Sequence, residues 1–427
     1  MKKLSHYLKI NLLFLFTTVT LMLFNSPHVT YDGWQYISSG QSIFDGTIYE
    51  NYFFVRKPLY PLFVGLCLKI SESLWTLLFV QTFFCVAAVG LLINSVVNFF
   101  EKDRKKRIFH KTILLILCCF VLGALPSFVL QQNAILILFS VVARHLWNSE
   151  TKQDKKNQEA IMNWFPWAFF SWIAFLIGLE IYITMILLVI VLTIKGRITR
   201  KQLLLTLVIS SIFVIASNYT LNKIHENAQV SQNYNLTNLN DPFLKENFID
   251  NMTVQLLDPN PPYSQKVIRA LLANLDLAPT VGWDGIYTSV YRDPGHPMAA
   301  FGLNHFLQNV SFCNNLPQEG VIAVKSEYVA IFEGCKRPLV QVPKQIKPFL
   351  YFLYLGVWPA IVLTAVFGRP KYALVWLPGI LLSVYALLGA GISRYGMVVY
   401  PTIIIIAFAN LIQAMIARSS NEQSNLK

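Results

Sequence analysis

The chain has 427 residues, of which 55% are hydrophobic and 13% charged, and its formal net charge is +13. So low a charged fraction excludes the two or three soluble domains that a chain of this length could otherwise form. Apolar runs of roughly 14–25 residues recur along it, the length needed to cross a bilayer core of about 30 Å. We therefore expect an all-α polytopic membrane protein.

The basic residues gather in short loops between the apolar runs, at Glu101–Lys111, Thr151–Lys156 and Lys195–Lys201. Cytoplasmic loops have this composition under the positive-inside rule. No basic stripe with interleaved aromatic residues occurs, so we expect no nucleic-acid partner. The positive charge is interpreted as a determinant of topology.

Ten apolar segments are expected to cross the membrane as helices. They lie at about 10–25, 74–98, 112–126, 129–147, 163–177, 179–194, 203–219, 348–367, 372–389 and 396–417. The first follows a basic start, as in a signal peptide, but no small-x-small cleavage pattern comes after it. We expect an uncleaved span.

The segment Arg56–Ile70 is the exception among the apolar runs. Its apolar part is about ten to thirteen residues, too short to span comfortably, and Pro58 and Pro61 suit a helix start. We expect a re-entrant or interfacial helix at 58–70. Every basic short loop and both termini are then cytoplasmic, whereas a crossing helix would place the loop 101–111 outside.

This topology divides the chain into three parts. They are a membrane module at 1–219 with an outer loop at 26–57, an outer soluble domain at 220–347, and a membrane module at 348–427. The weak alternation of Val321–Phe332 indicates a strand, and hence a mixed outer domain. Cys313 and Cys335 lie in this domain and could pair in an oxidising compartment, the alternative being a chance occurrence of two thiols.

Asp32 lies in the first outer loop, just after the first apolar run. One interpretation is structural, because Asp32 followed by Gln35 resembles a capping box for a helix at 33–44 that ends at Asp45-Gly46. The other is functional. Arg56 and Lys57 follow on the same outer side, and an acid beside such cations suits a site that holds a lipid phosphate while a base acts nearby.

A third cation, Arg394, is expected on the same side between the last two spans. The early outer-loop Asp with a following Tyr, the segment "RKPLYPL", and a late "RY" before the Pro-containing last span resemble the GT-C glycosyltransferases. The pattern is most similar to the bacterial protein O-mannosyltransferase and aminoarabinose-transferase group, over most of the chain. The resemblance implies a GT-C-like helical bundle in a bacterial inner membrane.

The same resemblance implies an inverting sugar transfer on the outer face from a polyprenyl-phosphate donor. It implies that Asp32 is the general base, and that Arg56 or Lys57, with Arg394, neutralise the departing phosphate. The residues implied to line the sugar or lipid pocket are Trp34, Tyr36, Tyr60 and Tyr395. Interfacial aromatic belts are the alternative explanation for these rings.

Two further acids are secondary candidates. Many relatives have a second acid directly after the first, whereas Gly33 follows Asp32 here, and Asp45 does not clearly match that pattern. Glu180 is the one acid at apparent membrane depth, where such residues are functional candidates by default. The first loop has no D-x-D pair, so we infer no metal or other cofactor, with a divalent metal left open.

Two other classes of function compete with a transferase. A transporter or flippase of lipid-linked glycan should show repeated halves and broken midplane helices, which the sequence does not show. A glycan polymerase or ligase also uses polyprenyl-linked donors. The acceptor is not indicated, and it could be a glycan, a lipid or a protein.

Overall fold

The computed structural model describes residues 2–24, 31–48, 52, 56–127, 129, 131–151, 164–226, 264, 267, 268, 271, 360–367, 373–387 and 396–425. Arg394, Tyr395, Cys313, Cys335 and Val321–Phe332 lie outside these ranges. So does nearly all of the expected outer domain, whose fold and disulfide stay predictions. Of Asp32 and Trp34 only the backbone is described.

All regular elements within the described residues are helices, as expected. They are α1 (Lys2–Phe24), α2 (Tyr31–Phe44), α4 (Leu59–Ile70), α5 (Leu74–Phe100), α6 (Arg104–Ala124), α7 (Gln132–Thr151), α9 (Trp164–Ile177), α10 (Leu179–Ile194), α11 (Arg200–Glu226), α18 (Trp376–Leu387) and α20 (Tyr400–Asn425), with short 3-10 turns at Leu125–Ser127 and Ala373–Val375. A further helical stretch covers 360–367.

The expected spans coincide with helices wherever the structure describes them. Two helical stretches, Leu74–Phe100 and Arg200–Lys223, are long and apolar enough to cross a membrane alone. Shorter apolar helices of 10–17 residues supply further candidates, at Asn11–Leu23, Leu59–Ile70, Trp164–Ile177, Leu179–Ile194, Trp376–Leu387 and Tyr400–Met415. The count of ten spans and their orientation stay predictions.

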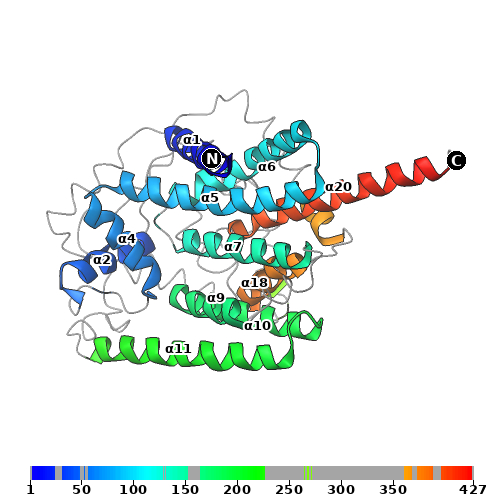
Figure 1. The fold of residues 1–427 in the computed structure, drawn as a ribbon. Coiled ribbons are helices and arrows are strands. Elements are labelled where there is room, and N and C mark those ends of the chain that lie inside the picture. Colours follow the sequence, from blue (N-terminus) through cyan, green and yellow to red (C-terminus); the bar gives the residue numbers. More distant parts are fainter. Residues whose placement is uncertain are drawn as a thin grey trace.

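Helix α5 packs against α1, α6, α7 and α20 (Figure 1). Phe14 of α1 rests on Gly90 of α5, where the missing side chain leaves room for the ring. Toward the other end of α5, the Trp147 ring of α7 packs 5.7 Å from the rings of Phe99 and Phe100. The apolar runs therefore form one continuous core.

The described basic loops 101–111 and 195–201 lie at one end of the bundle (Figure 1), and we call it the basic end. Glu150 at the end of α7 lies 3.7 Å from Arg197, which follows α10. Lys195 lies over the ring of Trp376 at the start of α18, with its ammonium 5.0 Å from the ring centroid. These contacts place the end of α7, the end of α10 and the start of α18 together, as an antiparallel bundle requires.

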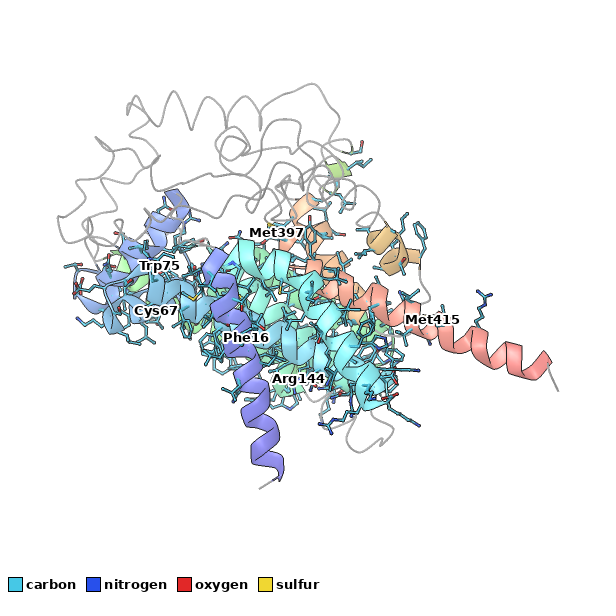
Figure 2. The ribbon with its side chains drawn as sticks, turned by 90° about the horizontal axis from the view of Figure 1, so that it is seen from above. Phe16, Cys67, Trp75, Arg144, Met397 and Met415 are labelled. Carbon is cyan, nitrogen blue, oxygen red and sulfur yellow. The ribbon has the colours of Figure 1, made fainter. Side chains whose placement is uncertain are left out.

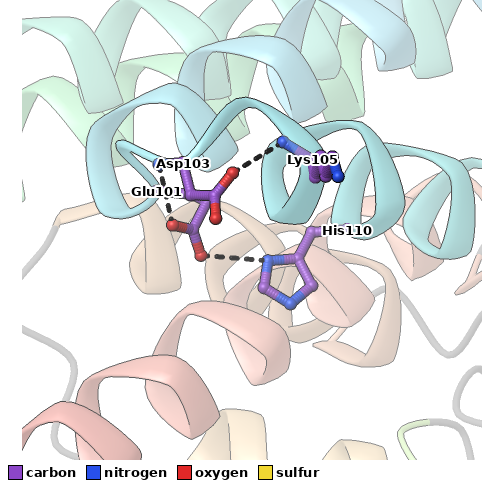
Figure 3. Close-up of polar contacts among 4 residues, drawn as sticks. All are labelled: Glu101, Asp103, Lys105 and His110. Carbon is purple, nitrogen blue, oxygen red and sulfur yellow. Dashed lines mark hydrogen bonds and ion pairs between the residues drawn. The ribbon is translucent and has the colours of Figure 1, made fainter.

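The turn between α5 and α6 also lies at the basic end, and two acids of the turn, Glu101 and Asp103, make hydrogen bonds within it (Figure 3). Asp103 caps α6 by accepting a hydrogen bond from the backbone N–H of Lys105 at 2.8 Å. Glu101 accepts from the backbone N–H of Asp103 at 3.1 Å and lies 3.7 Å from His110. The two acids of this strongly basic loop therefore stabilise the start of α6.

The C-terminal half of α20 extends away from the other described helices beyond the basic end (Figures 1 and 2). Met415, labelled there in Figure 2, is 59% exposed. Helix α11 runs along the outside of the bundle, where Leu204, Ile215 and Tyr219 are each more than 60% exposed. It continues to Glu226, into the range expected to begin the outer domain.

The opposite end of the bundle carries the two short helices α2 and α4 (Figure 1), and we call it the polar end. Helix α4 has 12 residues, about 18 Å at 1.5 Å per residue, which is shorter than a bilayer core of about 30 Å. It begins directly after Pro58, as the proline pattern predicted. The expectation that it does not cross the membrane is untested.

Helices α2 and α4 approach closely because each has a glycine at the crossing. A side chain on Gly40 would place its Cβ 2.5 Å from the Pro61 carbonyl oxygen and 2.7 Å from the Gly65 nitrogen. Real Cβ atoms do not approach backbone atoms so closely, so both positions require glycine if the backbones keep this separation. The crossing fixes α2 against the rest of the polar end.

Helix α2 corrects one prediction about Asp32. The helix begins at Tyr31, so Asp32 is its second residue and does not occupy the cap position. The capping-box interpretation, one of the two considered for Asp32, is therefore wrong. The end of the helix is as predicted: the Asp45 N–H donates to the Gln41 carbonyl, and Gly46 follows with a positive φ of 73°.

Candidate active site

Arg56 is held against one face of α2. Its Nε donates to Gln35 Oε1 at 2.6 Å, and its Nη1 donates to the Tyr36 hydroxyl at 3.4 Å. The guanidinium lies 4.9 Å from the centroid of the Tyr36 ring, in a cation–π arrangement. Arg56 itself is half-buried, so a positive charge is positioned at the polar end and stays accessible.

Tyr36 and Tyr60 form the support beneath this arginine. Both are almost fully buried, and their rings meet edge to face with centroids 4.9 Å apart, which joins α2 to α4. The Tyr60 hydroxyl donates to Gln81 Oε1 at 3.2 Å, and Gln81 Nε2 donates to the Pro126 carbonyl. Tyr36 therefore supports Arg56 directly and Tyr60 supports Tyr36, and their expected place in a sugar or lipid pocket stays a prediction.

Tyr52 fixes the backbone of the same segment. Its hydroxyl donates to the Arg56 carbonyl at 2.8 Å. Burial raises the pKa of Tyr52 above its ordinary value, and the neighbouring Tyr36 raises it further. The hydroxyl therefore stays protonated at neutral pH and remains a hydrogen-bond donor.

Lys57 extends from the same segment toward the corner between α9 and α10. Its ammonium lies 4.7 Å from the centroid of the Phe175 ring, and Phe175 packs edge to face on Tyr182 at 6.0 Å. The lysine is half-buried. Arg56 and Lys57 are therefore two neighbouring cations that different parts of the bundle hold in place.

Glu180 lies at the start of α10, in the segment that follows the Gly178 break between α9 and α10. Its Oε1 accepts a hydrogen bond from Gln131 Nε2 at 3.4 Å. Gly178 is the cap of α10, and a Cβ there would lie 2.5 Å from Glu180 Oε1, so the carboxylate folds back over the glycine.

Asp32 can be placed from the backbone alone. It precedes Gln35 by three residues and Tyr36 by four in the same helix, and residues with these spacings share a helix face. The face of α2 that holds Arg56 therefore includes position 32.

The structure does not bring the other predicted site residues to Arg56 or does not describe their side chains. Asp45 is exposed at the far end of α2, about 20 Å along the axis from Asp32, so the structure does not bring it to Arg56. Only the backbone of Trp34 is described, and Arg394 and Tyr395 lie outside the described residues. Among the described residues no group of three or more His, Cys, Asp or Glu could hold a metal ion.

Sequence reasoning missed three polar partners of the site. Gln35, Tyr52 and Gln131 each hold a charged residue or its backbone. Gln35 was considered only as part of a cap. The sequence "QQN" at 131–133, directly before an apolar helix, was a usable signal, because amides beside a membrane-spanning run need partners.

Comparison with known proteins gives two structural matches. No protein-family model and no curated protein matches the chain. Crystal structures of ArnT from Cupriavidus metallidurans, one bound to undecaprenyl phosphate and one in the apo state, match with a TM-score of 0.38 and 13% identity. The matches cover 96% of this chain and 78% and 77% of those chains.

ArnT is an aminoarabinose transferase of the GT-C class. The chain is thus similar to a member of the group that its sequence resembles.

Proposed function

We propose that this protein is a membrane glycosyltransferase that moves a sugar from a polyprenyl-phosphate donor to an acceptor on the outer face of the membrane. Arg56 and Lys57 bind the donor phosphate together with Arg394, and Asp32 is the general base. The observation that carries the proposal is the pair of half-buried neighbouring cations: Arg56 is held on the face of α2 that includes position 32, and Lys57 lies over Phe175 of α9. Phosphate is the ligand that such a pair suits.

The reaction makes one bond and breaks one. Asp32 accepts the proton of an acceptor hydroxyl, and that oxygen attacks the anomeric carbon of the sugar. The bond from the anomeric carbon to the phosphate oxygen breaks, and its electron pair leaves with the polyprenyl phosphate. Attack opposite the leaving group inverts the anomeric carbon. The cations stabilise the charge that develops on the departing phosphate.

Binding of undecaprenyl phosphate to the purified full-length protein in detergent tests the phosphate site. Lys57→Gln removes one of the three proposed cations, and we expect the dissociation constant to rise at least tenfold, the loss typical of a charge-assisted contact. Lys69→Gln is the matched control, because Lys69 is an exposed lysine in the last turn of α4, the helix that follows Lys57. Native mass spectrometry of the lipid complex measures both.

Equal weakening by Lys57→Gln and Lys69→Gln would show a non-specific attraction of the lipid to positive charge. Absence of lipid binding by the wild-type protein would contradict the proposed function itself.

A further inference from the structure

Two cations near the basic end belong to helices and not to loops. Lys111 lies in α6 and Arg144, labelled in Figure 2, lies in α7, and both side chains are half-buried. The Lys111 ammonium donates to Asn94 Oδ1 at 2.5 Å, and Arg144 Nε donates to Ser95 Oγ at 3.2 Å. Because Asn94 and Ser95 are consecutive residues of α5, the two cations reach one turn of this helix from its two neighbours.

These cations lie at the same depth in the bundle. Lys111 follows the start of α6 by seven residues, and Arg144 precedes the end of α7 by seven, so each lies about 10 Å from the basic end of its helix. Helix α5 has 27 residues and is about 40 Å long, close to the thickness of a bilayer with its headgroups, about 40–45 Å. Positions about 10 Å from the end therefore lie where the lipid headgroups meet the acyl chains.

One face of α5 changes from apolar to polar toward this depth. Phe84, Leu91, Asn94 and Asn98 follow one another at the spacings of a single helix face. Phe84 and Asn98 are exposed, and Leu91 and Asn94 are partly exposed. Asn98 Nδ2 donates to Asn94 Oδ1 at 3.2 Å. The face is thus apolar where acyl chains lie and polar at the level of the headgroups.

Both cations have hydrogen-bond donors left for a ligand at this surface. An ammonium has three donors and a guanidinium five, and among the described residues Lys111 and Arg144 each make one hydrogen bond. In the same part of the chain no carboxylate lies within 4 Å of either cation. Ile108, one turn before Lys111, and Val141, one turn before Arg144, are exposed, so both cations adjoin the surface of the bundle.

We propose that Lys111 and Arg144 bind the phosphate of an anionic phospholipid from the leaflet at the basic end, with an acyl chain along Leu91 and Phe84 of α5. Cations at membrane depth are costly unless opposite charge or polar groups satisfy them, and a phosphodiester supplies a charge and acceptor oxygens. The lipid connects α5, α6 and α7 at this end. The site lies away from the candidate active site, and the inference does not depend on the proposed function.

Binding of phosphatidylglycerol to the purified full-length protein in detergent, measured by native mass spectrometry, tests the site. The double variant Lys111→Gln/Arg144→Gln removes both cations, and we expect its dissociation constant to rise at least tenfold. Arg104→Gln/Lys105→Gln is the matched control, because it removes the same two residue types from exposed positions of α6. It should bind as the wild type does. Phosphatidylcholine, which has no net charge, should bind the wild type at least tenfold more weakly than phosphatidylglycerol.

Thermal unfolding in detergent separates loss of the site from loss of the fold. A glutamine at either position can still donate to Asn94 or Ser95, so we expect the double variant to fold. Phosphatidylglycerol should raise the unfolding midpoint of the wild type and of the control more than that of the double variant. If the double variant does not fold, Lys111→Gln and Arg144→Gln are compared singly, each with a smaller rise in the dissociation constant.

Four results would overturn the inference. Equal weakening in both double variants would show a general attraction to the basic end, and equal binding of phosphatidylcholine would show that net charge is not recognised. Displacement of phosphatidylglycerol by an equal concentration of soluble glycerol phosphate would show a free-phosphate site that does not use the α5 face. Loss of phosphatidylglycerol binding in Lys57→Gln would place this lipid in the candidate active site. Binding that survives Lys57→Gln and is lost with Lys111 and Arg144 supports the inference even if undecaprenyl phosphate does not bind.

Discussion

At the residue scale, the candidate site combines two neighbouring cations with polar side chains from distant parts of the chain. Arg56 and Lys57 were expected from their position in an outer loop, and the structure places both at the polar end. Glu180 and Gln131 come from parts of the chain that are more than 70 residues away from Arg56. Composition and local pattern carry no information about such pairings, because helix packing creates them.

Asp32→Asn tests the proposed general base. The amide cannot accept the proton of the acceptor, and loss of a positioned base typically lowers the rate by about 10²–10⁴-fold. Because Asp32 is the second residue of α2, the lost charge at the helix start should cost only about 0.3–1 kcal/mol of stability. Sugar incorporation by membranes of a complemented deletion strain measures the rate, and thermal unfolding measures the stability.

Asp45→Asn is the matched control for this variant, since Asp45 is an exposed acid at the other end of the same helix. It should leave transfer unchanged. Normal transfer by Asp32→Asn would show that this acid only favours the start of α2, and the catalytic assignment would be wrong.

At the element scale, the positions of Pro and Gly at the ends of the apolar runs predicted helix boundaries more reliably than the N-terminal capping pattern did. Pro58 marked the start of α4, and Asp45-Gly46 marked the end of α2. The start of α2 was placed two residues late. Acids are favoured at the cap position and also throughout the first turn of a helix, so one Asp does not fix which position it occupies.

The crossing of α2 and α4 gives a prediction at this scale. Gly40→Ala should destabilise the protein by several kcal/mol or separate the two helices, because the added Cβ would lie 2.5 Å from the Pro61 oxygen and 2.7 Å from the Gly65 nitrogen, both backbone atoms. Gly379→Ala in α18 is the control. Nothing lies within 4 Å of its Cβ position, so it should be neutral or stabilising by up to about 1 kcal/mol.

The fluorescence-detected thermal unfolding of the two purified variants measures this difference. Similar unfolding midpoints for Gly40→Ala and Gly379→Ala would contradict the close helix crossing. Loss of undecaprenyl phosphate binding only in the Gly40 variant would in addition connect the crossing to the position of Arg56.

At the scale of the whole molecule, the helices form an antiparallel bundle with two chemically different ends. The basic end has the short Lys- and Arg-rich loops, and the polar end has the cation pair, Glu180 and the buried amides. The alternation of apolar runs with basic loops was sufficient to predict this division. The outer domain could not be predicted in the same way, because a polar segment of mixed pattern does not select one fold.

The predicted orientation places the basic end in the cytoplasm. Lys105 and Asp45 are both exposed, so a cysteine at either position can react with a reagent. In intact cells a membrane-impermeant maleimide should label Asp45→Cys and leave Lys105→Cys unlabelled, and both should react after the membrane is permeabilised. Labelling of Lys105→Cys in intact cells would reverse the topology and remove the proposed site from the outer face.

Cleavage of the bond between sugar and lipid phosphate is the most direct test of the central claim, because a transporter or flippase leaves that bond intact. Membranes of a deletion strain, which hold both donor and acceptor, are incubated with the purified wild-type protein, and free polyprenyl phosphate is measured by mass spectrometry. We predict release of polyprenyl phosphate together with transfer of the sugar to a fraction that organic solvent does not extract, and neither with Asp32→Asn. Movement of an intact lipid-linked sugar between the leaflets, without release of polyprenyl phosphate, would contradict the assignment as a glycosyltransferase.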